Sequence, residues 1–441
     1  MKWLISCGMG LFLFCSCSRP ADTTPIPAPT VSAYLRIADE VDANLRHEIL
    51  DRFFPGTADD ANGGFFEDYA TDWTRQTSTG KSIVYQSRLT WTSAQAARRF
   101  PDQAGMYLAM TRRGAKCLAE MMWDQQRGGF YWSIDNNGEP SSPAKQMYGH
   151  AFGIFALAAS YEATHDQASL DLAKKAFQWM EDHAHDNERL GYFESIGPDG
   201  KRWISGDSAV GARPDQKSMN TSIHILEALT GLYRVWPDPL LKTRLRELLE
   251  ICRDRIYAEP GYLSQYLTLD WQRTPGPDSF GHDVEAGFLM VEAAQALNQA
   301  EDARIWTAAQ HLVDHAMKCG WDSQYGGLFY KAAIAADGSV NGDLDTRKIW
   351  WAQAEYLNAM LLLHERAGNQ ASAYWDGFVR EWNWIKASQI DHDSGGWLPA
   401  VEADGTPIKR GKADMWTDCY HQARAMMNVS DRLRELATGP D

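Results

Sequence analysis

The stretch "WDSQYGGLFY" at residues 321–330 has a near copy, "WDQQRGGFYW", at residues 123–132. Four further stretches share its pattern of glycine followed by alternating aromatic and polar residues. The repeated glycines are Gly64, Gly129, Gly191, Gly261, Gly327 and Gly396. Their successive intervals are 65, 62, 70, 66 and 69 residues. One period kept over six copies indicates a repeat architecture, in which each unit buries its apolar face against its neighbours.

Each repeat is predicted to contain two kinds of helix. "ASLDLAKKAFQWMEDHAHD" at 168–186 has one apolar face, which is typical of a helix with one side in solvent. "AQAEYLNAMLLLHERA" at 352–367 is apolar nearly all round, which predicts a helix enclosed by others. The glycine stretches between helices suit short strands or hairpins. We therefore predict an all-α fold: a closed (α/α)6 barrel of six helix-hairpin repeats with short β-hairpins at one end. An open solenoid is the alternative, although neither end shows a polar capping unit.

The N-terminus has the features of a secretory signal. One lysine is followed by an apolar run too short to span a membrane, and Cys17 after Ser16 resembles a bacterial lipoprotein cleavage box. We predict a lipoprotein-type signal peptide over residues 1–17, a flexible Pro/Thr/Ala tether over 18–34 and one barrel domain over 35–435. A lipid on Cys17 would be the chain's membrane contact, in the cell envelope. A plainly secreted form is the alternative.

The net charge of −15 and the lack of a Lys/Arg stripe exclude nucleic acid as a partner. The sequence contains no HExxH, GxSxG or P-loop motif, and no GxGxxG leading out of a strand. We therefore expect no metal, and acyl-transfer, NTP and dinucleotide chemistry lack support. We expect a monomer or a dimer.

Functional side chains recur 19 to 29 residues after each repeated glycine. They are Arg88, Tyr148, Asn220, His282, Trp351 and His421. If each begins an inner helix, all six should gather at one mouth of the barrel, which would form a small-molecule site. Helical spacing adds partners on the same faces, three or four residues further along. These are His224, Glu285, Glu355 and Arg424. Trp91, Trp351 and Trp416 are predicted to stack on sugar faces, with a place in the core as the alternative.

Four ordered stretches carry a resemblance to a known family. They are "KSMNTSIHILEALT" (217–230), "SFGHDVEAGFLM" (279–290), "KIWWAQAEYLNAML" (348–361) and "MWTDCYHQARAM" (415–426). They resemble motifs of the N-acylglucosamine 2-epimerase superfamily, most closely its cellobiose 2-epimerase (mannobiose 2-epimerase) branch, from about residue 35 to 435. The resemblance implies an (α/α)6 barrel that inverts C2 of the reducing-end sugar of a disaccharide or oligosaccharide without a cofactor.

The resemblance also implies residue roles. His282 and His421 would be the acid/base pair, and His224 would assist ring opening and binding. The sugar site would be lined by Arg88, Tyr148, Asn220, Glu285, Trp351 and Trp416. Two positions depart from the branch, which commonly has Trp in place of Phe288 and Pro in place of Cys419. Both lie beside the acid/base helices, so the identity of the sugar stays open.

The chemistry of C2 inversion fits these residue types. The sugar ring must open first, because only the open aldehyde makes the C2 hydrogen acidic. Two histidines on opposite faces can then remove and return a proton, while Arg88 stabilises the enediolate and Glu285 orients His282. Four alternatives stay open: a mannose isomerase type of aldose-ketose isomerase, an N-acylglucosamine 2-epimerase, a sugar-binding lipoprotein, and a glycosidase using Glu285 and Glu355 as its two carboxylates.

Overall fold

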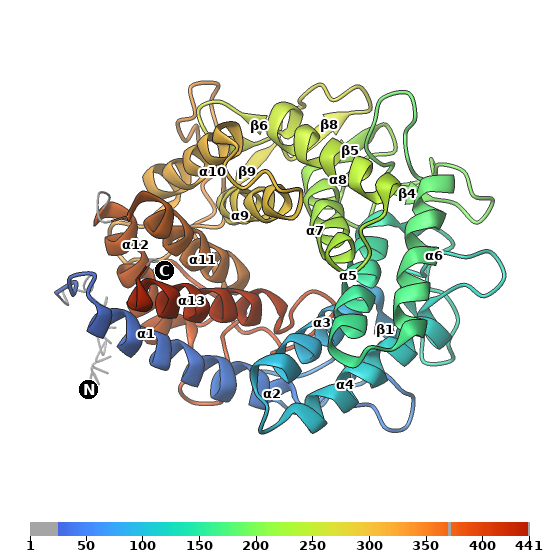
Figure 1. Cartoon of the computed structure of the whole chain (residues 1–441), viewed down its shortest axis with the longest axis horizontal. Helices are drawn as coiled ribbons and strands as arrows, with labels where there is room; N and C mark the ends of the chain where they lie inside the picture. Colours follow the sequence, from blue (N-terminus) through green and yellow to red (C-terminus); the bar gives the residue numbers. More distant parts are fainter. Residues whose placement is uncertain (1–24, 369–371, 440–441) are drawn as a thin grey trace, which may run out of the picture.

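Twelve long helices form two concentric rings (Figure 1). The computed structural model describes residues 25–368 and 372–439. The inner ring consists of α3 (Ile83–Arg99), α5 (Met147–Thr164), α7 (Met219–Val235), α9 (Phe280–Ala296), α11 (Trp350–Ala367) and α13 (Tyr420–Thr438). The outer ring consists of α1 (Val31–Asn44), α4 (Ala104–Cys117), α6 (Gln167–His183), α8 (Pro239–Ile251), α10 (Ala303–His315) and α12 (Ser372–Trp384). Consecutive inner helices contact one another, and α13 returns to contact α3. The predicted closed (α/α)6 barrel is confirmed.

The two kinds of helix also occupy the predicted rings. Outer helix α6 buries Leu170, Phe177 and Met180 and leaves its other side to solvent. Inner helix α11 is buried along nearly its whole length, from Trp350 to His364. A helix with apolar residues on every side thus lies in the inner ring, because only there does each side pack against a neighbour.

Short elements connect the helices. They are α2 (Asp51–Phe53) and the π-helical turns η1 (Leu45–Leu50), η2 (Leu118–Met122), η3 (Cys252–Ile256), η4 (Ala316–Gly320) and η6 (Ile385–Gln389). The strands are β1 (Lys81–Ser82), β2 (Ser133–Ile134), β3 (Lys145–Gln146), β4 (Ser195–Ile196), β5 (Gln216–Ser218), β6 (Tyr257–Ala258), β7 (Tyr262–Leu263), β8 (Tyr266–Thr268), β9 (Pro277–Ser279), β10 (Lys331–Ala333), β11 (Lys348–Ile349) and β12 (Ala400–Val401).

The strands join neighbouring repeats as well as forming hairpins. Strand β1, just before α3, pairs antiparallel with β2, which follows the next glycine stretch. The same pairing recurs for β3 with β4, β5 with β8, β9 with β10 and β11 with β12. A bridge between Tyr69 and Ala413 links the last repeat to the first. These ladders fix the loops at the N-terminal ends of the inner helices.

A lysine before most inner helices anchors the glycine loop of its own repeat. The side-chain ammonium groups of five such lysines each lie 2.6 to 2.9 Å from an aspartate located five residues before the repeated glycine. The pairs are Lys81–Asp59, Lys145–Asp124, Lys217–Asp186, Lys348–Asp322 and Lys412–Asp391. The repeat before α9 has no such pair.

The barrel starts earlier than predicted. Helix α1 begins at Val31 with Thr30 as its N-cap, so it includes the last residues of the segment predicted as a flexible tether. The carbonyl of Pro27 accepts a hydrogen bond from Trp375 Nε1 at 2.7 Å, and Tyr34 is buried. Residues 25–34 are therefore packed on the barrel. The predicted signal peptide, Cys17 and the first part of the tether lie outside the described residues.

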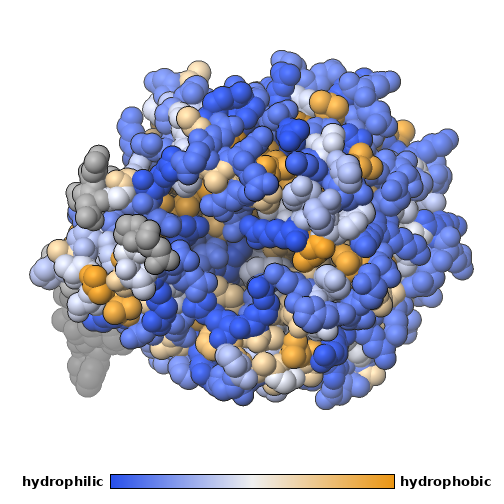
Figure 2. All heavy atoms as spheres, viewed as in Figure 1, coloured by the Kyte–Doolittle hydropathy of each residue, from blue (hydrophilic) through white to orange (hydrophobic). Residues whose placement is uncertain are grey.

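The face seen in Figure 2 is largely hydrophilic, with hydrophobic residues in small separate groups. Within the described part of the chain, no helix combines the length and the apolar character needed to cross a membrane.

Candidate active site

A cavity of about 380 Å³ opens at the N-terminal ends of the inner helices. We call it the N-terminal pocket. It is lined by Arg88, Tyr148, Asn220, His224, His282, Glu285, Tyr330, Arg347, Ile349, Trp350, Trp351, Arg410, Trp416 and His421. Nine of the twelve predicted site residues thus lie around one cavity, contributed by all six repeats. Of the other three, Glu355 and Arg424 lie beneath the lining and support it, and Trp91 lies elsewhere.

The imidazole of His421 is hydrogen-bonded to a buried carboxyl group. Its Nδ1 donates to Oε1 of Glu355 at 2.8 Å, and Oε1 of Glu285 is 3.6 Å away. Burial, together with the nearby Arg88 and Arg424, holds the pKa of His421 well below its ordinary value. Burial also raises the pKa of Glu355 to about 7, despite the adjacent Arg424. The pair can therefore share or pass a proton near neutral pH.

His282 is supported by a hydroxyl group instead. Its Nδ1 lies 2.8 Å from Oγ of Ser279, the N-cap of α9. The predicted orienting role of Glu285 is wrong: Glu285 lies one turn further along α9 and accepts a hydrogen bond from Arg424 at 2.7 Å. Burial, with His224 nearby, lowers the pKa of His282 to about 3, so its imidazole is neutral in the free protein.

The indole of Trp351 lies against both of these histidines. Its ring centroid is 4.6 Å from that of His282 and 5.5 Å from that of His421. The two imidazoles come from helices α9 and α13, which belong to different repeats. They therefore reach one cavity from two different repeats, and both contact Trp351.

His224 faces the same cavity from α7. Its Nδ1 donates to Oε2 of Glu227 at 3.0 Å, and its ring packs against Tyr148 and Phe152. Burial alone would raise the pKa of Glu227, but Arg424 and the hydrogen bond from His224 lower it to about 2. Glu227 thus remains a carboxylate that fixes the proton of His224 on Nδ1 and exposes Nε2.

Arg424 connects these carboxylates beneath the pocket. Its Nη2 donates to Oε1 of Glu285 and of Glu355, both at 2.7 Å, and its Nη1 donates to Glu227. We call this group of four the Arg424 network. Glu285, Glu355 and His421 place ligand-type atoms within 4.8 Å of one another, as a metal site requires. The guanidinium of Arg424 already supplies the positive charge there, so these residues do not need a metal ion for charge balance.

Arg88 is held rigidly at the pocket wall. Its Nη1 donates to Oδ2 of Asp418 and its Nη2 to the hydroxyl of Tyr148, both at 3.0 Å. Its Nε is buried with no protein partner. A fixed guanidinium of this kind can stabilise negative charge that develops on a bound molecule.

Aromatic side chains border the mouth of the pocket. Trp416 is 36% exposed, and its ring lies 5.6 Å from that of Trp132 and 5.7 Å from that of Tyr148. Trp91, in contrast, stacks on Phe155 and contacts Tyr420, so its predicted sugar contact is wrong. It lies on the third turn of α3, which faces the opposite end of the barrel.

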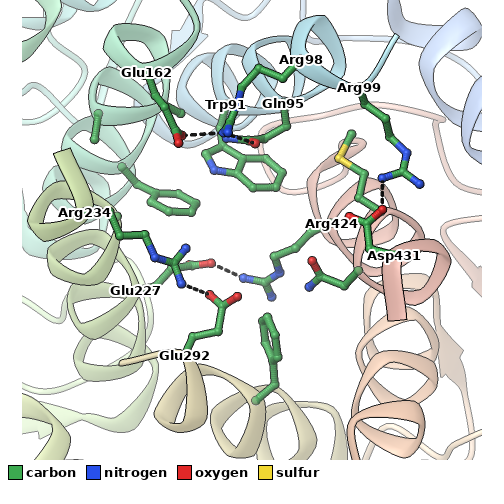
Figure 3. Close-up of a pocket in the computed structure, with 17 residues that line it drawn as sticks. Trp91, Gln95, Arg98, Arg99, Glu162, Glu227, Arg234, Glu292, Arg424 and Asp431 are labelled. Atoms are coloured by element: carbon green, nitrogen blue, oxygen red, sulfur yellow. Dashed lines mark hydrogen bonds and ion pairs between the residues drawn. The ribbon is translucent and has the colours of Figure 1, made fainter. Parts of the chain in front are cut away.

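The opposite end of the barrel contains a second cavity of about 560 Å³, the C-terminal pocket (Figure 3). Its arginines Arg98, Arg99 and Arg234 are each paired with an acidic residue. Phe288, one of the two departures from the related branch, lines this pocket rather than the N-terminal one. Glu227 and Arg424 form the floor between the two pockets.

Sequence analysis missed several supporting residues. Glu227 is three residues after His224, and Asp418 lies within a motif already quoted, so helical spacing could have identified both. Tyr330, Arg347 and Arg410 also line the pocket from loops. Tyr330 ends the repeated stretch at 321–330, so the repeat could have identified it, whereas Arg347 and Arg410 carry no periodic signal.

The chain matches the N-acylglucosamine 2-epimerase (GlcNAc 2-epimerase) family over residues 64–425. It is 30% identical over 400 residues to cellobiose 2-epimerase of Bacteroides fragilis, covering 89% of this chain and 98% of that protein. It is 24% identical to D-mannose isomerase of Marinomonas mediterranea, covering 86% and 94%. The structure of cellobiose 2-epimerase from Spirochaeta thermophila superimposes with a TM-score of 0.83 at 29% identity, covering 92% and 99%. The chain therefore belongs to the N-acylglucosamine 2-epimerase family, in its cellobiose 2-epimerase branch, and is a carbohydrate epimerase.

Proposed function

We propose that this protein inverts C2 of the reducing-end sugar of a disaccharide or short oligosaccharide, without a cofactor. The observation that carries the proposal is that His282 and His421, from two different helices, line one cavity and both contact Trp351. Relatives named cellobiose 2-epimerase support a disaccharide as the substrate. The exposed Trp416 offers a face on which a second sugar unit could stack.

The reaction would begin with ring opening. His224, with its Nδ1 proton bound to Glu227, presents Nε2 as an acceptor for the hydroxyl proton on C1. Transfer of that proton by His224 to the ring oxygen would break the bond between C1 and the ring oxygen, leaving an aldehyde. The C2 hydrogen then becomes acidic.

Inversion requires one base and one acid on opposite faces of C2. One imidazole would take the C2 proton, and the electron pair would move onto the C1 oxygen to give a cis-enediolate. Arg88 would stabilise that oxyanion, since its charge is fixed by Asp418 and its Nε has no protein partner. The second imidazole, in its protonated form, would return a proton to C2 from the other face, and ring closure would complete the epimer.

The surroundings of the two histidines support this exchange of roles. His421 and Glu355 can hold one proton between them, since burial raises the pKa of Glu355 to about 7, and Ser279 can either donate to His282 or accept from it. Neither arrangement needs a bound ion. Each histidine would deprotonate the epimer whose C2 hydrogen faces it.

Aldose-ketose isomerisation is the second candidate, because the same enediolate protonated at C1 yields a ketose. The relationship to D-mannose isomerase favours it. A glycosidase is disfavoured by the geometry, since Glu285 and Glu355 both bind the same nitrogen of Arg424 and leave no sugar-sized gap between them.

The test is hydrogen exchange in D2O, followed by NMR. We expect deuterium at C2 of cellobiose or mannobiose together with formation of the epimer. Deuterium at C1 of a ketose product would instead indicate isomerisation. Binding without exchange for cellobiose, mannobiose, lactose, mannose and N-acetylmannosamine would reject both reactions and favour a sugar-binding protein.

A further inference from the structure

The repeat that carries α9 departs from the lysine rule of the other repeats. Lys81, Lys145, Lys217 and Lys348 each stand two residues before an inner helix, and Asp278 occupies that position before α9. The aspartate expected five residues before Gly261 is also absent, since Ile256 stands there. This repeat therefore has a buried carboxyl group where the others have a buried ammonium group.

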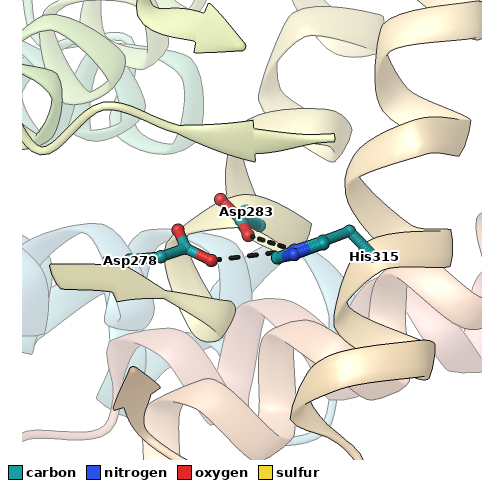
Figure 4. A group of neighbouring side chains, drawn as sticks. All are labelled: Asp278, Asp283 and His315. Atoms are coloured by element: carbon teal, nitrogen blue, oxygen red, sulfur yellow. Dashed lines mark ion pairs between the residues drawn. The ribbon is translucent and has the colours of Figure 1, made fainter. Parts of the chain in front are cut away.

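A second carboxyl group faces the first. The fourth residue of an inner helix commonly binds the backbone after the repeated glycine, as Gln86 and Gln353 do with neutral amides. In α9 the fourth residue is Asp283, and its Oδ1 accepts from the backbone N–H of Leu263 at 3.0 Å. Its Oδ2 is left pointing toward Asp278 and His315 (Figure 4).

The third member of the group is His315, the last residue of α10. Its Nε2 lies 2.9 Å from the carbonyl oxygen of Gly338, which can only accept, so Nε2 carries a proton. In the neutral ring, Nδ1 then carries no proton and has a free lone pair. Nδ1 lies 3.7 Å from Oδ2 of Asp278 and 3.5 Å from Oδ2 of Asp283, too far for good hydrogen bonds.

Within the described residues, four atoms of this group have no hydrogen-bond donor when both carboxyl groups are ionised. They are both carboxylate oxygens of Asp278, Oδ2 of Asp283 and Nδ1 of His315. All three side chains are at least 95% buried. Buried acceptors without donors are costly, and polar groups inside proteins are normally paired or bound to an ion.

We propose that Asp278, Asp283 and His315 bind one divalent transition-metal ion, with Zn²⁺ as the preferred ion. The ligand-type atoms lie within 4.8 Å of one another. Their measured separations of 3.5 and 3.7 Å are close to the edges of a tetrahedron around an ion with bonds of about 2.1 Å, roughly 3.4 Å. The imidazole favours Zn²⁺ over Mg²⁺ or Ca²⁺, which prefer oxygen ligands.

The surroundings also match those of a metal ligand set. His315 donates its other ring N–H to a backbone carbonyl, and Asp283 uses its second oxygen to accept from a backbone N–H. Such contacts orient metal ligands and fix their protonation. The ion would take the place of the lysine ammonium group and would tie α9 to α10. It lies outside the N-terminal pocket, so this inference is independent of the reaction.

The ion would also stabilise the segment that presents His282. Asp278 and Asp283 stand on either side of Ser279 and His282 in the sequence. We therefore assign a structural role to the ion and no role in proton transfer. Sequence analysis expected no metal, because two aspartates five residues apart and a distant histidine match no known spacing.

The test is metal content and thermal stability of the purified protein after dialysis against a chelator and readdition of ZnCl2. We expect one Zn²⁺ per chain and a rise in melting temperature of several degrees, because an ion that binds only the folded state stabilises it. His315→Gln and Asp278→Lys should bind no Zn²⁺ above background. His311→Gln, one turn earlier on the same helix and outside the group, should behave as the wild type.

Asp278→Lys is the decisive variant, because it restores the ammonium group that the other repeats use. It should fold, as judged by circular dichroism, and its melting temperature should not respond to Zn²⁺. This readout remains available if His315→Gln fails to fold. The rival explanation is a proton shared by the two carboxyl groups. A wild type that bound no Zn²⁺ would overturn our proposal in favour of the shared proton. An Asp278→Lys variant that bound one equivalent, as the wild type does, would overturn it by placing the ion at another site.

Discussion

The two ends of the barrel contain cavities of opposite character. The C-terminal pocket is the larger, at about 560 Å³ against about 380 Å³, and its arginines are each paired with an acid. The N-terminal pocket instead contains three histidines with a ring nitrogen free to face a ligand. The histidines with a free ring nitrogen, rather than the size of the cavity, therefore identify the N-terminal pocket as the candidate active site.

The largest effect should come from removing a histidine at the N-terminal pocket. We expect His421→Asn to lower the rate of C2 epimerisation roughly 10³-fold, since a positioned acid or base contributes about 10²- to 10⁴-fold. Product formation and deuterium uptake at C2, both followed by NMR, measure the effect. His311→Asn, on outer helix α10, is the matched control and should keep full activity. A fully active His421→Asn variant would exclude His421 from the mechanism.

The second effect concerns the Arg424 network between the two pockets. Glu355→Gln should lower kcat/KM about 10²-fold, because the amide cannot stabilise a proton on His421. Burial raises the pKa of both Glu355 and Glu285 to about 7, so the carboxylates form as pH rises through 7. The kcat/KM of the wild type should therefore fall as pH drops below about 7. In the Glu355→Gln variant, the part of this decrease in kcat/KM that comes from protonation of Glu355 should be absent.

The control for Glu355 is another buried glutamate. Glu381 on α12 is fully buried, and both of its oxygens are without a hydrogen-bond partner. Burial raises its pKa well above the ordinary value, as it does for Glu355. Glu381→Gln should leave both the rate and the pH profile unchanged. If Glu355→Gln also left them unchanged, the network would have only a structural role.

Much of this organisation was predictable because it is periodic. Six glycine stretches at one period were enough to predict the closed barrel, and the phase of Arg88, Tyr148 and His282 within their repeats predicted one shared cavity. Each inner helix begins at the same end of the barrel, so polar residues near the starts of these helices meet there. Their roles in catalysis remain predictions.

A smaller effect should come from Ser279, which hydrogen-bonds His282 and none of the other histidines of the N-terminal pocket. Ser279→Ala removes the hydrogen bond to Nδ1 of His282 and should lower kcat/KM fivefold to tenfold, the equivalent of about 1 kcal/mol. The hydroxyl makes no capping bond to α9, so the melting temperature should change little. Ser82→Ala, which removes the N-cap bond of α3, should show the reverse: lower stability with nearly normal activity. Equal losses of activity in both variants would contradict a specific contact to His282.

The features that sequence analysis missed depend on the direction of individual side chains. Glu285 is one turn from His282, yet it binds Arg424, because a guanidinium at the barrel axis is a stronger partner than a hydroxyl-bound imidazole. The group around Asp278 arises from residues on two helices and one strand that share no spacing. Such contacts depend on packing between repeats, which a single sequence does not report.

The smallest effect should come from the C-terminal pocket. Phe288 stands where the related branch commonly has Trp, and it lines this pocket with its ring 5.6 Å from the Arg424 guanidinium. Phe288→Trp keeps an aromatic face beside Arg424, and the adjacent cavity has room for the larger ring. We therefore expect the ratio of kcat/KM for cellobiose to that for mannobiose to change less than about threefold, since ring-cation contacts of this kind differ by under 1 kcal/mol. A tenfold change in that ratio would mean that the Arg424 network transmits the shape of one pocket to the other, and the two ends of the barrel would no longer be independent.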